Sequence, residues 1–196
     1  MKTWHAKQRG LADLYGNWEE SYALLPHYFE AMKTANPGTV VHFVNKSTPS
    51  PNVEVFDRVF WAFGLSTKGF KHCRPIITID GTHLYGKCKG VLLISIGVDA
   101  NDKIFPLAFV IVDCESIDTW RWFLGSIRHY VTKRDGLCIF SDRHVGIIRA
   151  MNEFGGGWKE PHVFHRYYIH YHASNINTKF KSNELKIAFL STATAT

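Results

Sequence analysis

The stretch Pro75-Ile76-Ile77-Thr78-Ile79-Asp80-Gly81-Thr82-His83 decides how the rest of the chain is arranged. An apolar, β-branched run that is bounded by turn-forming residues predicts a central strand buried on both faces. A strand of this kind carries its reactive groups at its C-terminal end, where the sheet opens to solvent. The pattern recurs at Leu137-Cys138-Ile139-Phe140-Ser141-Asp142-Arg143-His144. Two buried strands that each end in an aspartate predict a paired-carboxylate metal site formed by Asp80 and Asp142.

Composition limits the class of protein. The chain has 196 residues, 45% of them apolar, which is enough for one folded core with a small addition. The net charge of +6 permits a polyanionic partner without requiring one. The longest apolar runs, Val91–Val98 and Ile104–Val112, are far shorter than the ~18–20 residues that cross a bilayer, so no membrane association is expected. Met1–Asn17 lacks the apolar centre of a signal peptide, and the four cysteines lack C-x-x-C spacing; both features favour an intracellular protein with reduced thiols.

Residues 1–65 are predicted to form a small, mainly helical N-terminal appendage. A helix is expected from Asn17 onward, kinked or split at Pro26, followed by a strand over Thr39–Val44. The aromatic segment Val53–Gly64 fits either a strand or a helix. We assign its Phe and Trp side chains to core packing and not to base stacking.

Residues 66–196 are predicted to form an α/β domain with the element order β-β-β-α-β-α-β-α. Three strands in a meander, followed by a crossover helix that returns the fourth strand beside the first, is the plan of the ribonuclease H-like fold. This plan is a mixed five-stranded sheet with flanking helices, and it brings Asp80 and Asp142 onto adjacent parallel strands. Pro106 cannot donate to a strand ladder, which predicts that the third strand lies at a sheet edge.

Several motifs of this chain resemble plant Mutator-like element (MULE) transposases, over roughly residues 20–190. The resemblance implies a DDE-type nuclease that cleaves and transfers DNA strands at transposon ends in the nucleus, with self-association as a further expectation. The matching motifs are Phe60-Trp61-Ala62-Phe63-Gly64, Gly69-Phe70-Lys71-His72-Cys73-Arg74-Pro75, Asp80-Gly81-Thr82-His83-Leu84-Tyr85-Gly86, Gly97-Val98-Asp99-Ala100-Asn101, Phe105-Pro106-Leu107-Ala108-Phe109, Ser141-Asp142-Arg143-His144 and His165-Arg166-Tyr167.

By this resemblance, Asp80 and Asp142 are the first two catalytic acids and hold Mg²⁺ or Mn²⁺. Two such ions about 4 Å apart stabilise both the attacking and the leaving oxygen of a phosphodiester, and carboxylate oxygens are suitable ligands for them. Because Gly81 has no Cβ, we expect the nucleic-acid backbone to approach closely there. The basic residues expected to bind DNA near the acidic pair are Lys87, Lys89, Arg143, Arg149 and Arg166.

The third acid of the DDE site is the main departure from the family. The resemblance puts the catalytic Glu far downstream, after a helical insertion, and the chain ends at Thr196. We therefore expect a truncated, catalytically incomplete core. Glu184 is the alternative third ligand if the chain is an unrelated metal-dependent nuclease. Asp142 has a second interpretation as the cap of the following helix. Glu115 and Asp118, near the crossover helix, could approach the site, but we assign them to capping.

A second departure concerns the segment after the fifth strand. The Cys-x-x-His element of the family is replaced by Tyr168 and Tyr171. The histidines at positions 162, 165, 170 and 172 do not have the spacing of a closed zinc site, and we assign a structural role to His165. These losses leave a second class of function open, namely a relic or domesticated transposase-derived domain that only binds nucleic acid or protein.

Overall fold

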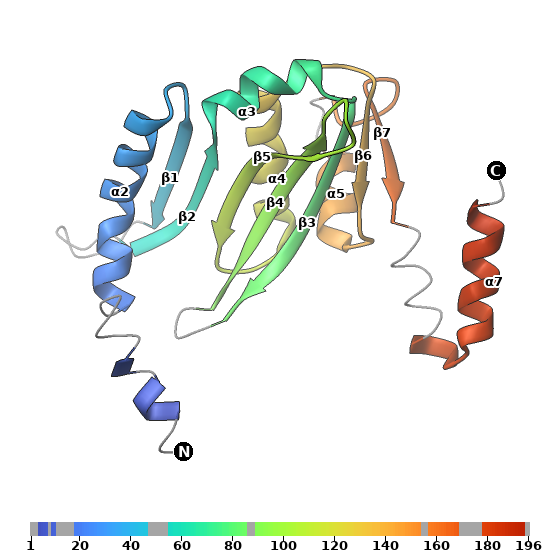
Figure 1. The fold of residues 1–196 in the computed structure, drawn as a ribbon, viewed down its shortest axis with the longest axis horizontal. Coiled ribbons are helices and arrows are strands. Elements are labelled where there is room, and N and C mark those ends of the chain that lie inside the picture. The colour runs from blue at the N-terminus through green and yellow to red at the C-terminus, as the bar shows by residue number, and fades with distance from the viewer. Residues whose placement is uncertain are drawn as a thin grey trace.

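The computed structural model describes residues 4–7, 9–10, 18–46, 55–85, 89–153, 157–168 and 178–194. These residues form a mixed α/β structure built on one seven-stranded sheet (Figure 1). The α/β class predicted from the sequence is therefore confirmed. The elements are α2 (Trp18–Ala35), β1 (Val40–Lys46), β2 (Val55–Ala62), α3 (Gly64–Gly69), the 3₁₀ turn η1 (Phe70–His72), β3 (Ile76–Leu84), β4 (Gly90–Val98), β5 (Ile104–Val112), α4 (Ile117–Ser126), the π-helical turn η2 (Ile127–Val131), β6 (Leu137–Ser141), α5 (Val145–Glu153), β7 (Val163–Tyr167) and α7 (Asn183–Thr194).

The strand order is β1-β2-β5-β4-β3-β6-β7. It contains the predicted meander β3-β4-β5 and the predicted parallel pairing of β3 with β6 after the crossover helix. The number of strands differs from the prediction, because β1 and β2 extend the sheet beyond β5 instead of standing apart from it. The N-terminal segment thus contributes strands as well as the helix α2. The order of the inner strands fixes which strand ends lie side by side.

Pro106 does not mark a sheet edge, so this prediction was wrong. β5 lies between β4 and β2, but β2 pairs only with Phe109–Ile111, at the far end of β5 from the proline. On the other side, Pro106 sits where the register between β4 and β5 shifts, next to Ser95 and Ile96. The missing N–H of a proline is tolerated at such an irregularity in the ladder. The proline therefore limits how far β2 pairs along β5, without making β5 an edge strand.

The two faces of the sheet are covered by different helices. On one face, α4 and α5 pack together behind the strands in Figure 1 and bury Phe60, Leu93 and Phe123 completely. On the other face, Phe29 of α2 packs against Phe43 and Trp61 at ring-centroid distances of 5.3 Å. Aromatic packing on both faces holds β2 in the sheet, which confirms that the Phe and Trp side chains of this segment serve the core.

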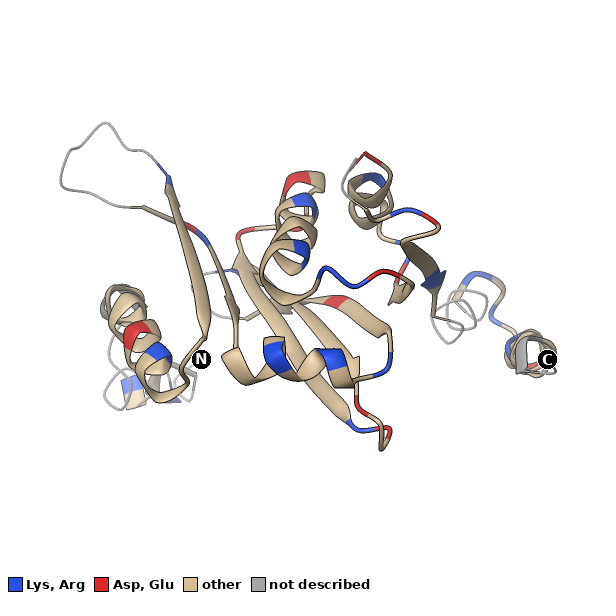
Figure 2. Cartoon of the chain, turned by 90° about the horizontal axis from the view of Figure 1, so that it is seen from above, with Lys and Arg blue, Asp and Glu red and all other residues tan. Residues whose placement is uncertain are grey.

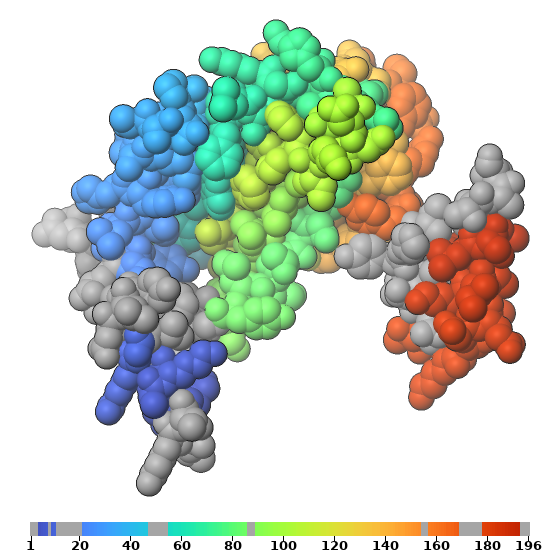
Figure 3. Space-filling model, viewed as in Figure 1, coloured from blue at the N-terminus to red at the C-terminus, as the bar shows by residue number. Residues whose placement is uncertain are grey.

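One helix differs from the prediction, and another stands apart from the sheet. α2 runs as one helix through Pro26, so the proline does not split it. α7 stands clear of the sheet in Figures 1 and 3, and its Leu185 and Ile187 are exposed. In the described part of the chain, no helix combines the length and the hydrophobicity that crossing a membrane requires.

Candidate active site

Asp80 and Asp142 lie at the same level of two adjacent parallel strands. The pairing of β3 with β6 aligns Ile76 with Cys138 and Thr78 with Phe140. Two residues further along each strand come Asp80, within β3, and Asp142, directly after β6. Neighbouring strands are spaced about 4.8 Å apart, so this register brings the two backbone positions together. The fold therefore juxtaposes the two acids that the sequence singled out.

Each of the two carboxylates also takes part in local structure. Asp80 Oδ1 accepts a hydrogen bond from the Gly81 amide at 2.9 Å. Asp142 Oδ1 accepts one from the His144 amide at 2.9 Å and so shapes the turn that begins α5. The helix-start interpretation of Asp142 is therefore correct in part. Within the described ranges, no three His, Cys, Asp or Glu side chains converge closely enough to hold a metal ion in this conformation.

Gly81 is in contact with an acidic residue that the sequence had assigned to capping. A Cβ built on Gly81 would lie 2.0 Å from Glu115 Oε1 and 3.1 Å from Leu93 Cδ2. Glu115 thus fills the space beside Gly81. The prediction that a nucleic-acid backbone approaches closely at Gly81 is therefore wrong for this face of β3. The cap of α4 is Ser116, whose side chain accepts a hydrogen bond from the Thr119 amide. Asp118 instead pairs with Arg121 at 2.7 Å.

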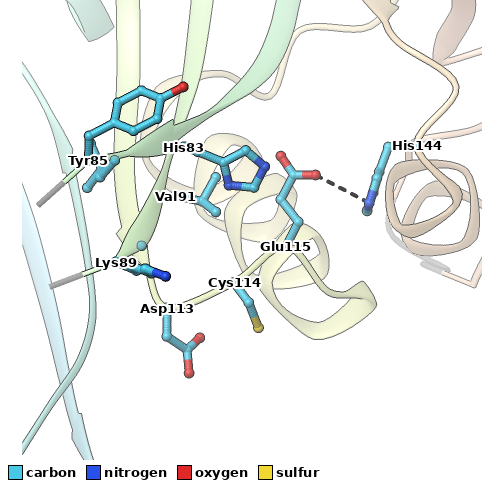
Figure 4. Close-up of a pocket in the computed structure, with 10 residues that line it drawn as sticks. His83, Tyr85, Lys89, Val91, Asp113, Cys114, Glu115 and His144 are labelled. Atoms are coloured by element: carbon cyan, nitrogen blue, oxygen red, sulfur yellow. Dashed lines mark ion pairs between the residues drawn. The ribbon is translucent and has the colours of Figure 1, made fainter. Parts of the chain in front are cut away.

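The other oxygen of Glu115 contacts His144. Glu115 Oε2 lies 3.2 Å from His144 Nε2, as the dashed line in Figure 4 shows. His144 Nδ1 accepts a hydrogen bond from the Gly146 amide at 3.2 Å in the first turn of α5. Because Nδ1 acts as an acceptor, a neutral ring carries its proton on Nε2, the atom that faces Glu115. A continuous chain of contacts therefore runs from β3 through Glu115 to the loop that carries Asp142.

An open pocket of about 780 Å³ lies beside this chain of contacts. Its polar lining includes His83 from the end of β3, Lys89 before β4, Glu115 and His144, and Figure 4 shows these side chains converging from separate elements. Asp113 lines it too. Burial opposes ionisation of Asp113, but the hydrogen bond and charge of Lys46 outweigh it and lower the pKa of that carboxyl. The pocket therefore presents both acidic and basic groups to solvent.

The predicted DNA-binding residues do not form one patch. Figure 2 shows lysines and arginines spread over several elements. Lys89, Arg143, Arg149 and Arg166 are exposed, whereas Lys87 lies outside the described residues. The Arg143 guanidinium stacks 5.4 Å from the centroid of the Tyr167 ring, and Arg166 lies 3.6 Å from Glu160. Arg143 and Arg166 are therefore near the ends of β6 and β7, beside Asp142, while Lys89 and Arg149 lie on other elements.

The remaining candidates after β6 are separated from the acidic pair. Glu184 lies in the first turn of α7, which stands clear of the sheet, so this structure does not bring it to Asp80 and Asp142. His165 is half-buried, and its Nε2 lies 2.8 Å from Ser141 Oγ, in agreement with the structural role assigned to it. Tyr171, His170 and His172 fall outside the described residues.

Glu115 and His144 are the residues that sequence reasoning missed. His144 follows Asp142 by only two positions, which is a local signal that could have been used. The contact between Glu115 and His144, however, joins residues 29 positions apart and depends on how α4 crosses back over the sheet. No periodicity in the sequence carries that information.

Comparison with known proteins shows what this chain is similar to. Residues 76–171, which include β3 to β7 and both aspartates, match the family model described as the MULE transposase domain. The resemblance to MULE transposases noted in the motifs is therefore confirmed over these residues. FAR1-RELATED SEQUENCE 10 of Arabidopsis thaliana is 27% identical to it over 112 residues. The aligned segment is 56% of this chain and 16% of that protein, so the chain corresponds to a small part of the relative's length.

Proposed function

We propose that residues 66–196 form the ribonuclease H-like core of a MULE-type transposase, a DDE nuclease and strand transferase that acts on DNA with a divalent metal. In the structure described here the core is catalytically incomplete, because no third acid of the described residues joins the pair. The observation that carries the proposal is the register of β3 and β6, which aligns Asp80 with Asp142 inside the segment matched by the MULE transposase domain. The inner strand order β5-β4-β3-β6-β7 supports the fold assignment.

The donor set of the pair suits Mg²⁺ or Mn²⁺, because both side chains offer carboxylate oxygens and neither offers nitrogen or sulfur. Asp80 and Asp142 would hold the ion. When bound, the ion supplies positive charge that stabilises the oxygens of a phosphodiester. The chain's own residues supply the support: the amides of Gly81 and His144 donate to the two carboxylates and hold their rotamers.

DNA is the proposed partner. The net charge of +6 and the exposed Lys89, Arg143, Arg149 and Arg166 would neutralise backbone phosphates. Because these residues lie on separate elements, we expect binding to be weak. We also expect it not to depend on the DNA sequence, since phosphate contacts orient a duplex without reading its bases. Action at transposon ends, self-association and a nuclear location remain part of the proposal through the resemblance to MULE transposases.

A second candidate function is a domesticated or relic domain that only binds nucleic acid or protein. The observation that favours it is that each of the two carboxylates already accepts a local hydrogen bond. In such a domain, the aspartates would be retained for the turn and the strand, and binding would not depend on a metal ion.

Titration of a fluorescent DNA duplex at two salt concentrations tests the DNA partner. We expect binding that weakens steeply as salt rises, because bound cationic side chains release counterions from the duplex. Binding that does not respond to salt, or no binding at low salt, would count against DNA as a partner in either candidate function. Titration with Mn²⁺ then separates the two candidates: the transposase core binds the ion and loses it in Asp80→Asn, whereas the domesticated domain binds none.

A further inference from the structure

We propose that Glu115 and His144 are a positioning pair that fixes the loop carrying Asp142 against the strand carrying Asp80. This inference rests on the proposed metal-dependent function and adds two residues to it. Neither residue is proposed as a metal ligand. Their part is to set the separation of the two aspartates that would hold the ion.

Glu115 contacts β3 at Gly81. Glu115 Oε1 occupies the position that a Cβ would take at Gly81, at 2.0 Å from the built atom. Gly81 follows Asp80 directly, and side chains alternate between the faces of a strand. Asp80 therefore leaves β3 on the face opposite Glu115. The carboxylate of Glu115 lies against β3 at Gly81.

Glu115 also contacts the turn after β6. Its Oε2 lies 3.2 Å from His144 Nε2. The His144 ring is itself fixed, because Nδ1 accepts the Gly146 amide at 3.2 Å. The backbone amide of the same residue donates to Asp142 Oδ1 at 2.9 Å. A shift of His144 would therefore carry the Asp142 carboxylate with it.

A contact between the two segments is needed at the level of Asp80 and Asp142, because the strand pairing does not extend that far. The pairing of β3 with β6 runs from Ile76 and Cys138 to Thr78 and Phe140, so the ladder between the two strands ends two residues before the aspartates. Asp142 lies beyond the end of β6, in a turn. Glu115 and His144 supply a connection between the two segments where the sheet does not. Glu115 is 79% buried at its side chain and His144 is 65% buried, so their contact is partly shielded from water.

Mn²⁺ binding to the full chain, measured by calorimetry, tests the pair through four variants. Glu115→Ala removes the acceptor, and Gly81→Ala keeps Glu115 but puts a methyl group where its carboxylate lies. We expect each to weaken Mn²⁺ binding about tenfold, the effect typical of losing a group that orients a metal ligand. Glu115→Gln keeps an oxygen that can accept from His144 Nε2, so it should restore most of the affinity lost in Glu115→Ala. The matched control is Asp118→Ala, which removes an exposed carboxylate three residues away and should bind like the wild type.

The ¹⁵N resonances of the His144 ring give a readout that does not depend on metal. The wild type and Glu115→Gln should show the proton on Nε2, and Glu115→Ala and Gly81→Ala should show this signature altered. Thermal unfolding of each variant checks that it is folded.

Three results would overturn the inference. If Glu115→Gln loses as much affinity as Glu115→Ala, the charge of Glu115 matters and the residue is a ligand. If Glu115→Ala and Gly81→Ala both bind like the wild type, the pair positions nothing. If the wild type itself binds no Mn²⁺, the proposed metal site fails and this inference fails with it; that outcome differs from the first two because it appears before any variant is made.

Discussion

Ser141 and His165 join β6 to β7 one residue before Asp142, with Ser141 Oγ 2.8 Å from His165 Nε2. Ser141 is fully buried, and its hydroxyl donates to the Asp142 carbonyl oxygen at 2.7 Å. The hydroxyl proton is thus engaged, so His165 Nε2 is the donor in its contact with Ser141. Burial, together with the nearby charge of Arg166, lowers the pKa of His165 below its ordinary value of 6.5.

This lowered pKa predicts that folding stability decreases in mildly acidic solution. Below pH 6.5 the unfolded chain protonates His165 while the folded chain does not, so the unfolded state binds more protons. The contribution of His165 to stability is present above pH 6.5 and is lost as the pH falls from there through the folded pKa. His165→Gln keeps a donor at the Nε2 position but cannot be protonated.

Urea unfolding of the wild type and His165→Gln, followed between pH 7.5 and 4.5, measures this effect. The difference in free energy of unfolding between the two proteins should be constant above about pH 7 and should shift in favour of the variant at lower pH. A difference that is the same at every pH would show that His165 does not contribute in this way.

A second prediction concerns the place of β2 in the sheet. Phe60 is fully buried, and its ring lies 6.5 Å from that of Phe123 in α4. Phe60→Ala should therefore cost about 3–5 kcal/mol, as loss of a buried aromatic side chain does. Leu65→Ala is the matched control: Leu65 is 74% exposed, and its truncation should change stability by no more than about 0.5 kcal/mol. If Phe60→Ala unfolds like Leu65→Ala, residues 1–65 are a separate unit, as the sequence suggested.

The inner part of the fold was predictable because its signals are local. The apolar runs that became β3, β4, β5 and β6 and the apolar stripe of α4 each carry their own pattern, and the chirality of the crossover returns β6 beside β3. The position of β2 was not predictable, since Val53–Gly64 has no clear period and its partner, Phe109–Ile111, is about fifty residues away. The Asp pair could be proposed from the sequence because each acid follows an apolar run, although β3 does not end at Asp80 as predicted but continues to Leu84. Glu115 was missed because its partners, Gly81 and His144, lie on other strands and loops.

A third prediction concerns DNA binding by α5. Arg149 is exposed on this helix, whereas Arg121 on α4 is held by Asp118 and Glu153. An arginine already paired with carboxylates gains little from a phosphate, while an unengaged one releases a counterion when it binds. Arg149→Ala should weaken duplex binding and reduce the salt slope by about one, and Arg121→Ala should change neither. Equal effects of the two variants would mean that α5 does not face the duplex.

The last prediction is that this chain alone does not cut DNA. Asp80 and Asp142 can together hold one divalent ion, with water completing its shell. Cleavage by a DDE site needs a second ion in a fixed place, and no third carboxylate of the described residues joins the pair to anchor it. Glu115 does not replace that anchor, because it lies on the opposite face of β3, with Oε1 packed against Gly81 and Oε2 3.2 Å from His144 Nε2.

Nicking of supercoiled plasmid in Mg²⁺ or Mn²⁺ is the measurement, with Asp142→Asn as the control. We expect neither protein to cut. Robust nicking by the wild type that disappears in Asp142→Asn would contradict the prediction and would mean that a third acid reaches the pair. Glu115→Gln and Glu184→Gln would then identify it: loss of nicking in the first makes Glu115 a ligand, and loss in the second means that α7 folds back onto the sheet. Nicking that survives in Asp142→Asn comes from a contaminating nuclease, because removing one of two metal ligands leaves no site that could act.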